Sequence, residues 1–244
     1  MPEMKTPNLG PSKDAARRAR ILDAAAALIT HFGYDKTTVS DIANKAGISK
    51  GAVYLHFKSK EEVLEALLIG ATYAFSESWF AAIENDPEGG RISNMYLNML
   101  IALDNNPFMS IIMRKDPSIL GNYLKQPGNF FETQQSTGMR QEFITLMQEA
   151  GAVRKDLNPA VTAHIMDIFS YGLIIIQDFK SEKDTPPTDE VIRAIADMMD
   201  CALTPAEGAN SEAGKRILRQ LYAAGIAEFE KSINQKADQN DCSK

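Results

Sequence analysis

The sequence predicts an all-α protein in which a small basic N-terminal unit of three helices precedes a longer, acidic helical body. Apolar residues recur at helical spacing through most of the chain, and no alternating run of useful length indicates a β-strand. The prolines of the body also fall between the predicted helices, where they interrupt no helical hydrogen bonds. These prolines are Pro107, Pro117, Pro127, Pro159, Pro186, Pro187 and Pro205.

The first helix is predicted from Arg17 to Phe32 and follows a polar, proline-rich segment, residues 1–13, that we expect to be a disordered tail. Its inward face is defined by apolar residues at 3.6-residue spacing. They are Ile21, Leu22, Ala25, Leu28, Ile29 and Phe32.

Two short helices joined by a glycine turn follow directly. Thr38 is placed to cap a helix that ends at Gly47, and its predicted inward face consists of Val39, Ile42, Ala43 and Ala46. Ser49 is placed to cap the next helix, predicted from Lys50 to Phe57 with Val53 and Phe57 on its buried edge. This pattern is typical of a helix-turn-helix.

A fourth helix begins with the capping-box pattern of Ser59 and Glu62 and continues past Trp79 until Pro87 and Gly90 break it. We expect it to be the only segment that links the N-terminal unit to the body. The remaining helices are predicted over residues 92–104, 108–115, 130–150, 161–179, 189–203 and 212–233.

The N-terminal region closely resembles the DNA-binding domain of the TetR/AcrR family of dimeric, ligand-responsive transcriptional regulators. The residues that carry the resemblance are Phe32-Gly33-Tyr34, Thr37-Thr38-Val39, Asp41-Ile42-Ala43, Ala46 to Gly51 and Tyr54-Leu55-His56-Phe57. The resemblance implies a helix-turn-helix DNA-binding domain over residues 14–60. It also implies a helical-bundle ligand-binding and dimerisation domain over residues 61–244, and operator DNA, a small-molecule effector and a second copy of the chain as partners.

The candidate DNA-binding residues lie on and around the second helix of the motif. The start of that helix faces the base edges of the major groove, which nominates Ser49, Lys50, Gly51 and Ala52. By resemblance, Thr38, Tyr54, His56 and Lys60 contact phosphates. A purely structural Tyr54 and a solvated His56 are the alternatives from the residues alone.

The charge distribution supports a nucleic-acid partner although the net charge is −6. Residues 1–60 carry a net charge of +5, whereas the rest of the chain carries −11. A basic head on an acidic body favours contact with phosphates at one end of the protein only.

The body is rich in methionine and aromatic residues, which suit either an ordinary core or a pocket for an apolar or amphipathic effector. The candidate ligand-binding residues are Phe75, Trp79, Tyr96, Met99, Met113, Arg140, Phe143 and His164. The helices over residues 161–179 and 189–203 carry more apolar surface than one face needs, and the resemblance implies that they form a homodimer interface through residues such as Leu173 and Ile195. The helix after Pro205 could cover the body, extend the dimer or stay loose.

Several classes of protein are not expected. The sequence has no catalytic motif, no metal-ligand spacing and no cofactor-binding loop, so we expect no enzyme, no metal and no cofactor. The two cysteines, the absence of a leader and the absence of an apolar run near 20 residues predict a cytoplasmic protein without a membrane span. The expected function is a transcriptional repressor released from its operator by ligand. The alternative is a helical small-molecule-binding protein or an unrecognised enzyme that keeps the head as scaffold. This alternative predicts that Lys50, Tyr54 and Lys60 do not converge on one exposed basic face.

Overall fold

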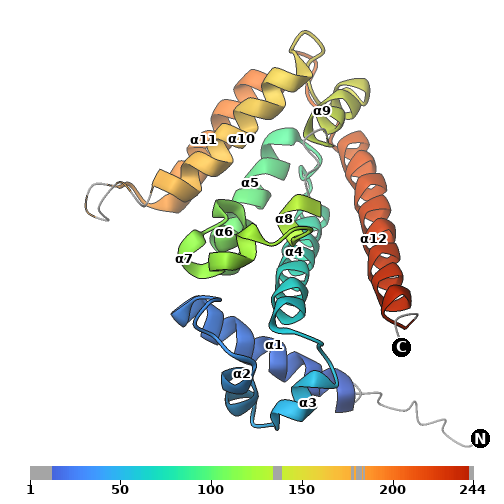
Figure 1. Cartoon of the computed structure of the whole chain (residues 1–244). Coiled ribbons are helices and arrows are strands. Elements are labelled where there is room, and N and C mark those ends of the chain that lie inside the picture. The colour runs from blue at the N-terminus through green and yellow to red at the C-terminus, as the bar shows by residue number, and fades with distance from the viewer. Residues whose placement is uncertain (1–12, 134–138, 177–178, 180–182, 184, 242–244) are drawn as a thin grey trace, which may run out of the picture. The chain divides into compact units, whose positions relative to one another are not determined.

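The computed structural model describes residues 13–133, 139–176, 179, 183 and 185–241, and the side chains of residues 107, 133, 139, 140 and 228–241 are not described within these ranges. Every regular element in the described part of the chain is helical (Figure 1). The elements are α1 (Lys13–Phe32), α2 (Val39–Ala46), α3 (Lys50–Tyr54), α4 (Lys60–Asn85), α5 (Ile92–Asp104), α6 (Pro107–Arg114), α7 (Pro117–Leu120), the 3-10 helix η1 (Gly121–Lys125), α8 (Phe130–Thr133), α9 (Met139–Glu149), α10 (Pro159–Ile175), α11 (Thr188–Leu203) and α12 (Ser211–Asp241). The predicted all-α class is therefore confirmed.

The chain divides into two compact units. Unit 1 contains residues 1–73 and 111–135, and unit 2 contains residues 74–110 and 136–244. The chain consequently passes between the units at three places: within α4, within α6, and between α8 and α9. The expectation that α4 alone links the N-terminal unit to the rest is wrong, because residues distant in sequence return to pack in unit 1.

The helix-turn-helix of unit 1 forms as its caps predict. The Thr38 hydroxyl accepts a hydrogen bond from the Asp41 amide, while the Asp41 carboxylate accepts one from the Thr38 amide. Gly47 ends α2 in the left-handed conformation with φ of 67°, which costs glycine little. Ser49 caps α3 by accepting from the Ala52 amide. Helix α3 ends at Tyr54, earlier than predicted, because residues 55–59 form the turn into α4.

Of the two hydrogen bonds in the capping box predicted for the start of α4, one forms as predicted and the other has a different donor. The Ser59 hydroxyl accepts from the Glu62 amide, but the Glu62 carboxylate reaches the amide of Lys58 instead of that of Ser59. By length and composition alone, α4 is one helix in the described chain that could cross a membrane, which the sequence analysis did not anticipate. Its residues Val63, Leu64 and Leu68 are buried within unit 1.

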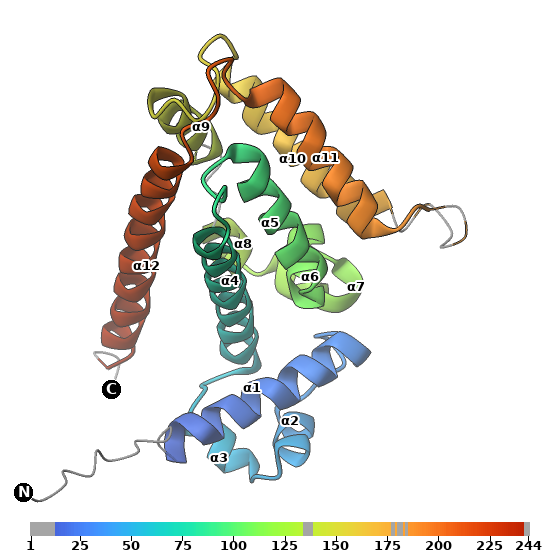
Figure 2. The same cartoon turned by 180° about the vertical axis from the view of Figure 1, so that it is seen from behind.

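Unit 2 has one hydrophobic core, built by the end of α4 and by α5, α9, α10, α11 and the first turns of α12. Helices α10 and α11 lie side by side, as both views show (Figure 2). The Asp200 carboxylate of α11 accepts hydrogen bonds from Arg91 and from the Ser93 hydroxyl of α5. Partial burial opposes the charge on Asp200, but these donors outweigh it and hold the pKa of the carboxyl below its ordinary value.

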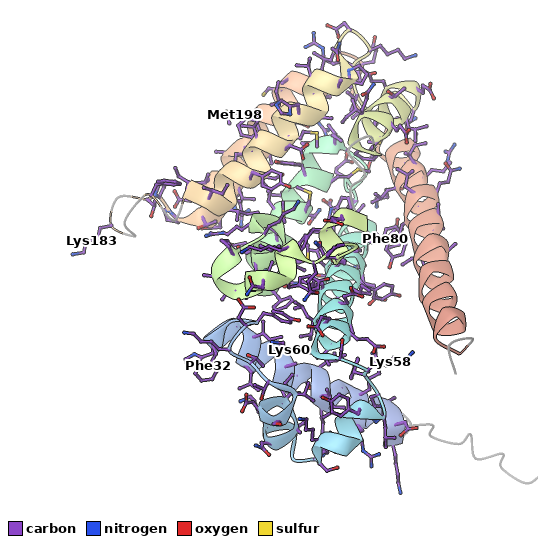
Figure 3. All side chains as sticks on the ribbon, viewed as in Figure 1. Phe32, Lys58, Lys60, Phe80, Lys183 and Met198 are labelled. Carbon is purple, nitrogen blue, oxygen red and sulfur yellow. The ribbon has the colours of Figure 1, made fainter. Side chains whose placement is uncertain are left out.

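The N-terminal part of α12 covers the body, which resolves one of the alternatives left open by the sequence. Leu218 lies in the core of unit 2, and Arg219 donates two hydrogen bonds to the Glu84 carboxylate at the end of α4. The rings of Phe80 and Tyr222 stack with centroids 4.2 Å apart, and Figure 3 shows Phe80 on the side of α4 that faces α12.

Most helices of the body match their predicted ranges within a few residues, but α12 continues to Asp241, eight residues beyond its predicted end, and one further region differs. The predicted helix over residues 130–150 is observed as α8 and α9, with residues 134–138 between them outside the described part. Helices α7 and η1 were not predicted, because they are too short to produce a helical period. Both pack in unit 1.

Candidate nucleic-acid interface

The start of α3 presents its predicted base-reading residues to solvent. Ser49, Lys50 and Gly51 are exposed, while Ala52 is half-buried. An added Cβ at Gly51 would meet only the Ser49 hydroxyl oxygen, at 3.9 Å, so the backbone here is open to close approach. A cation beside an open backbone can reach a base edge or a phosphate oxygen.

Tyr54 lies on the same exposed side of α3. The Lys50 ammonium is 5.9 Å from the centroid of the Tyr54 ring, and the ring is about half-exposed. A phenol and an ammonium are thus brought together by the i, i+4 spacing of one helix, with both polar ends free to meet an anionic surface.

The Lys60 side chain does not lie on the exposed face of Lys50 and Tyr54 but contacts Tyr34. Its ammonium donates to the Tyr34 carbonyl at 2.8 Å and lies 4.0 Å from the centroid of the Tyr34 ring. The Tyr34 hydroxyl in turn donates to Glu61. Burial, and then this bond to a carboxylate, raise the pKa of Tyr34 above its usual range, while the phenol donor lowers the pKa of Glu61. In this conformation Lys60 links α4 to the corner between α1 and α2.

His56 and Thr38 were predicted to contact phosphates, and their surroundings in the folded chain bear on that prediction. The Nε2 atom of His56 is buried and has no hydrogen-bond partner, so this nitrogen does not face solvent here. The Thr38 hydroxyl donates to the Asp41 carboxylate at 2.6 Å, within the cap of α2. Lys50 and Tyr54 therefore share one exposed face, and Lys60 does not join them in this conformation. For Lys60, this is the arrangement that the alternative function predicts.

Leu55 was missed by the sequence analysis. Its side chain is 80% exposed directly after α3, whereas Val53 and Phe57 are buried. The signal was present in the sequence, because a residue midway between Val53 and Phe57 falls on the opposite side of the chain from the core. The exposed Lys58 follows in the same turn and adds a second cation that the sequence analysis left out.

The predicted ligand-binding residues are distributed over both units. Phe75, Trp79, Tyr96, Met99, Phe143 and His164 belong to unit 2, and Met113 belongs to unit 1. Trp79, Met99 and Phe143 are partly buried against the core of unit 2. The buried Tyr96 hydroxyl is engaged by the Met166 carbonyl and Ser170, His164 is exposed on α10, and the side chain of Arg140 lies outside the described residues.

The α10–α11 pair has an exposed apolar face, but not at the two positions named from sequence. Ile195 is 7% exposed in the core of its own unit, and Leu173 is packed against that core. The large hydrophobic side chains that remain exposed on these helices and at the end of α10 are Val161, Ile165, Ile168, Tyr171, Ile175, Ile176 and Met198. Figure 3 shows Met198 on the outer side of α11. We refer to this set as the α10–α11 face.

The capped α2–turn–α3 pair joined to a helical region defines a helix-turn-helix protein of the all-α class. The family described as "Bacterial regulatory proteins, tetR family" matches residues 21–67. Residues 21–67 therefore resemble the N-terminal domain of the tetR family. The relatives that match this region include transcriptional repressors.

Similarity to individual proteins is strongest in the N-terminal region. The chain is 48% identical over 58 residues to the transcriptional repressor KstR2 of Mycolicibacterium smegmatis, which covers 24% of this chain and 28% of that protein. It is 28% identical over 164 residues to the A-factor receptor protein of Streptomyces griseus, which covers 66% of this chain and 55% of the receptor. The chain thus matches about half the length of one relative and about a quarter of the other.

The solved structure of the regulator FadR from Bacillus subtilis, in complex with stearoyl-CoA, has a similar fold. It aligns with a TM-score of 0.55 and 18% identity over 74% of this chain and 96% of FadR. The likeness therefore extends well beyond the helix-turn-helix, and at this identity it concerns the fold alone. Among the described residues, no group of three or more His, Cys, Asp or Glu side chains is placed to hold a metal ion.

Proposed function

We propose that this protein is a cytoplasmic transcriptional repressor that binds operator DNA as a homodimer and releases it when a small apolar or amphipathic molecule occupies unit 2. The observation that carries the DNA-binding part is the exposed pair of Lys50 and Tyr54 on α3, within a head of net positive charge. Lys50 contacts base edges together with Ser49, Gly51 and Ala52. Tyr54 donates to a phosphate oxygen, and Thr38, His56 and Lys60 donate to further phosphate oxygens.

Operator selection from genomic fragments tests the DNA-binding part, with the Lys50→Ala and Tyr54→Phe variants compared on the selected site. Lys50→Ala should change the preferred bases, because it removes a base contact. Tyr54→Phe should weaken binding to all sequences by about fivefold, the effect of losing roughly 1 kcal/mol of hydrogen bonding. Failure of the wild type to select any site would contradict the proposed function.

The salt dependence of operator binding tests Lys60. If the Lys60 ammonium leaves Tyr34 for a phosphate on DNA, Lys60→Ala should reduce the slope of log affinity against log salt by about 0.9. Arg216→Ala, an exposed cation on α12 of unit 2, is the matched control and should leave the slope unchanged. An unchanged slope for Lys60→Ala would remove Lys60 from the DNA contacts.

The homodimer is proposed from the α10–α11 face. Two helix-turn-helix heads read two half-sites only when a dimer holds them about one DNA turn apart, roughly 34 Å, or a multiple of it. Most of the exposed apolar side chains of this face lie on α10, with Met198 on α11, and an exposed apolar set of this kind supports an interaction surface. A second copy of the same face would cover it with a two-fold arrangement.

The effector site is proposed on the side of unit 2 lined by the end of α4. Phe75, Trp79 and Phe80 are only half-buried there, although they are among the largest apolar side chains of the unit. Met99 and Phe143 are partly buried against the same core as Trp79. FadR, a structural neighbour, was solved with stearoyl-CoA, which supports a long apolar ligand for this chain also.

Trp79 is the single tryptophan of the sequence and provides a direct probe of that site. Its indole nitrogen donates to the Met95 carbonyl at 2.8 Å, so a ligand that displaces α5 or covers the ring should change the emission. Stearoyl-CoA should shift the fluorescence of Trp79 and lower operator affinity. Trp79→Ala should reduce this response more than it reduces ligand-free operator binding. Unchanged emission with stearoyl-CoA and with lipids extracted from the purified protein would contradict this site.

A further inference from the structure

The corner between α1 and α2 is bound by a segment that lies more than 80 residues later in the chain. The Tyr34 amide donates to the Ile119 carbonyl at 2.7 Å. The Asp35 carboxylate accepts from the backbone amide of Asn122 at 3.2 Å and 3.1 Å, and from its side-chain amide at 3.2 Å. We call these contacts, between Tyr34–Asp35 and Ile119–Asn122, the corner clasp.

The two segments of the corner clasp lie very close together at two glycines. Gly121 has φ of 51°, and a Cβ added there would lie 2.3 Å from an Asp35 carboxylate oxygen. Gly33 has φ of 82°, and a Cβ there would lie 2.9 Å from the Ser118 carbonyl oxygen. Both positions need glycine for their conformation. A Cβ at Gly33 would meet a backbone oxygen, whereas a Cβ at Gly121 would displace the Asp35 carboxylate from its present position. The rings of Tyr34 and Tyr123 add an edge contact with centroids 5.7 Å apart.

The corner leads directly into the DNA-reading helices. The buried Thr37 side chain donates to the Gly33 carbonyl at 2.9 Å, which ties the start of the corner to its end. Thr38 then caps α2. A shift of Tyr34 and Asp35 therefore displaces the first turn of α2 and, through the packing of α2 on α3, the residues that face DNA.

We infer that Asp35 is a positioning residue for operator binding: the closed corner clasp holds α2 and α3 in the arrangement that fits the operator. This inference rests on the proposed function. Segment 111–135 joins unit 2 at both of its ends, so the clasp is a connection to the head that does not run along α4. Binding of DNA and closure of the clasp then favour each other by the same factor.

The experiment measures operator affinity for Asp35→Ala, Asp35→Asn and Asp23→Ala. Removing a carboxylate from a DNA-binding head should by itself strengthen binding, and Asp23→Ala, an exposed position on α1, measures that effect. Asp35→Ala should instead weaken binding by about threefold to tenfold, because the acceptor for Asn122 is lost. Asp35→Asn retains an acceptor oxygen and should recover most of the affinity.

Two further readouts separate positioning from a phosphate contact and from misfolding. The salt slope of Asp35→Ala should equal that of the wild type, because no phosphate contact is removed. Hydrogen exchange on the wild type should show slower exchange of the Tyr34 and Asn122 amides when operator DNA is added. Gly121→Ala, which forces the clasp apart, should weaken binding in the same direction as Asp35→Ala.

Two results would overturn the inference. One is an operator affinity for Asp35→Ala that matches Asp35→Asn and Asp23→Ala. The other is exchange at Tyr34 and Asn122 that does not respond to operator DNA, which is measured on the wild type and so does not depend on a variant that folds. Either result, with a wild type that binds its operator, leaves the proposed function intact. Absence of operator binding by the wild type contradicts the proposed function itself.

Discussion

Ile168→Glu should convert the proposed dimer into folded monomers that bind operator at least a hundredfold more weakly. Ile168 is 56% exposed on the α10–α11 face, so a glutamate is solvated in the monomer and does not disturb the core of unit 2. In a two-fold interface the substitution buries two carboxylates without partners, and each costs several kcal/mol. Loss of the second head then removes a gain in avidity of roughly 10² to 10⁴.

Sedimentation velocity gives the oligomeric state, and a fluorescence-anisotropy titration gives operator affinity. Ala223→Glu adds the same charge at an exposed position of α12 in the same unit and should leave both unchanged. Met198→Glu should behave like Ile168→Glu, because Met198 is 54% exposed on the neighbouring helix. A folded Ile168→Glu protein that sediments as a dimer would exclude this face as the interface. Ile195→Glu is unsuitable for the purpose, since it places a charge in the core of a single subunit.

Gly90→Ala should destabilise unit 2 by about 3 kcal/mol and release the start of α12. A Cβ at Gly90 would lie 1.6 Å from the Ser211 carbonyl oxygen and 2.8 Å from the Lys215 amide nitrogen. Both neighbours are backbone atoms of the first turns of α12, so no rotamer change can relieve the overlap. Helix α12 must move away, and the contacts of Leu218 and Arg219 with unit 2 are then lost.

Chemical denaturation measures this loss, and limited proteolysis locates it at residues 205–220. Gly70→Ala is the matched control, because nothing lies within 4 Å of an added Cβ there. That variant should be slightly more stable than the wild type, by about 0.5–1 kcal/mol, since glycine inside a helix is unfavourable. A Gly90→Ala protein with the denaturation midpoint of the wild type would show that α12 does not depend on this contact.

The helix-turn-helix could be predicted from local sequence signals alone. Thr38, Gly47 and Ser49 act within four residues of where they stand, so the sequence predicts their caps without knowledge of the rest of the fold. The family resemblance was also local, because it depends on fixed spacings in the same segment. Leu55 could have been added by the same reasoning, since its exposure follows from the buried residues on either side of it.

Contacts between distant segments could not be read in this way. The carboxylate of Asp35 meets Asn122 only because residues 111–135 return to unit 1, and nothing at either position indicates the other. The same limit applies to Lys60, which was assigned to phosphate from its motif and donates to Tyr34 in the folded chain. It also applies to Ile195 and Ile168, which are equally apolar in sequence and lie on opposite sides of the α10–α11 pair.

The sequence by itself therefore determined the all-α class, the capped helix-turn-helix and the basic head, since helical period, capping and charge act over a few residues. Only the tertiary structure decided which apolar residues remain exposed for a partner, how α12 covers the body and which later segment binds the corner before α2. The physical reason is that burial and hydrogen bonding between distant segments depend on the packing of whole elements. That packing is a property of the folded chain and has no counterpart in any short stretch of its sequence.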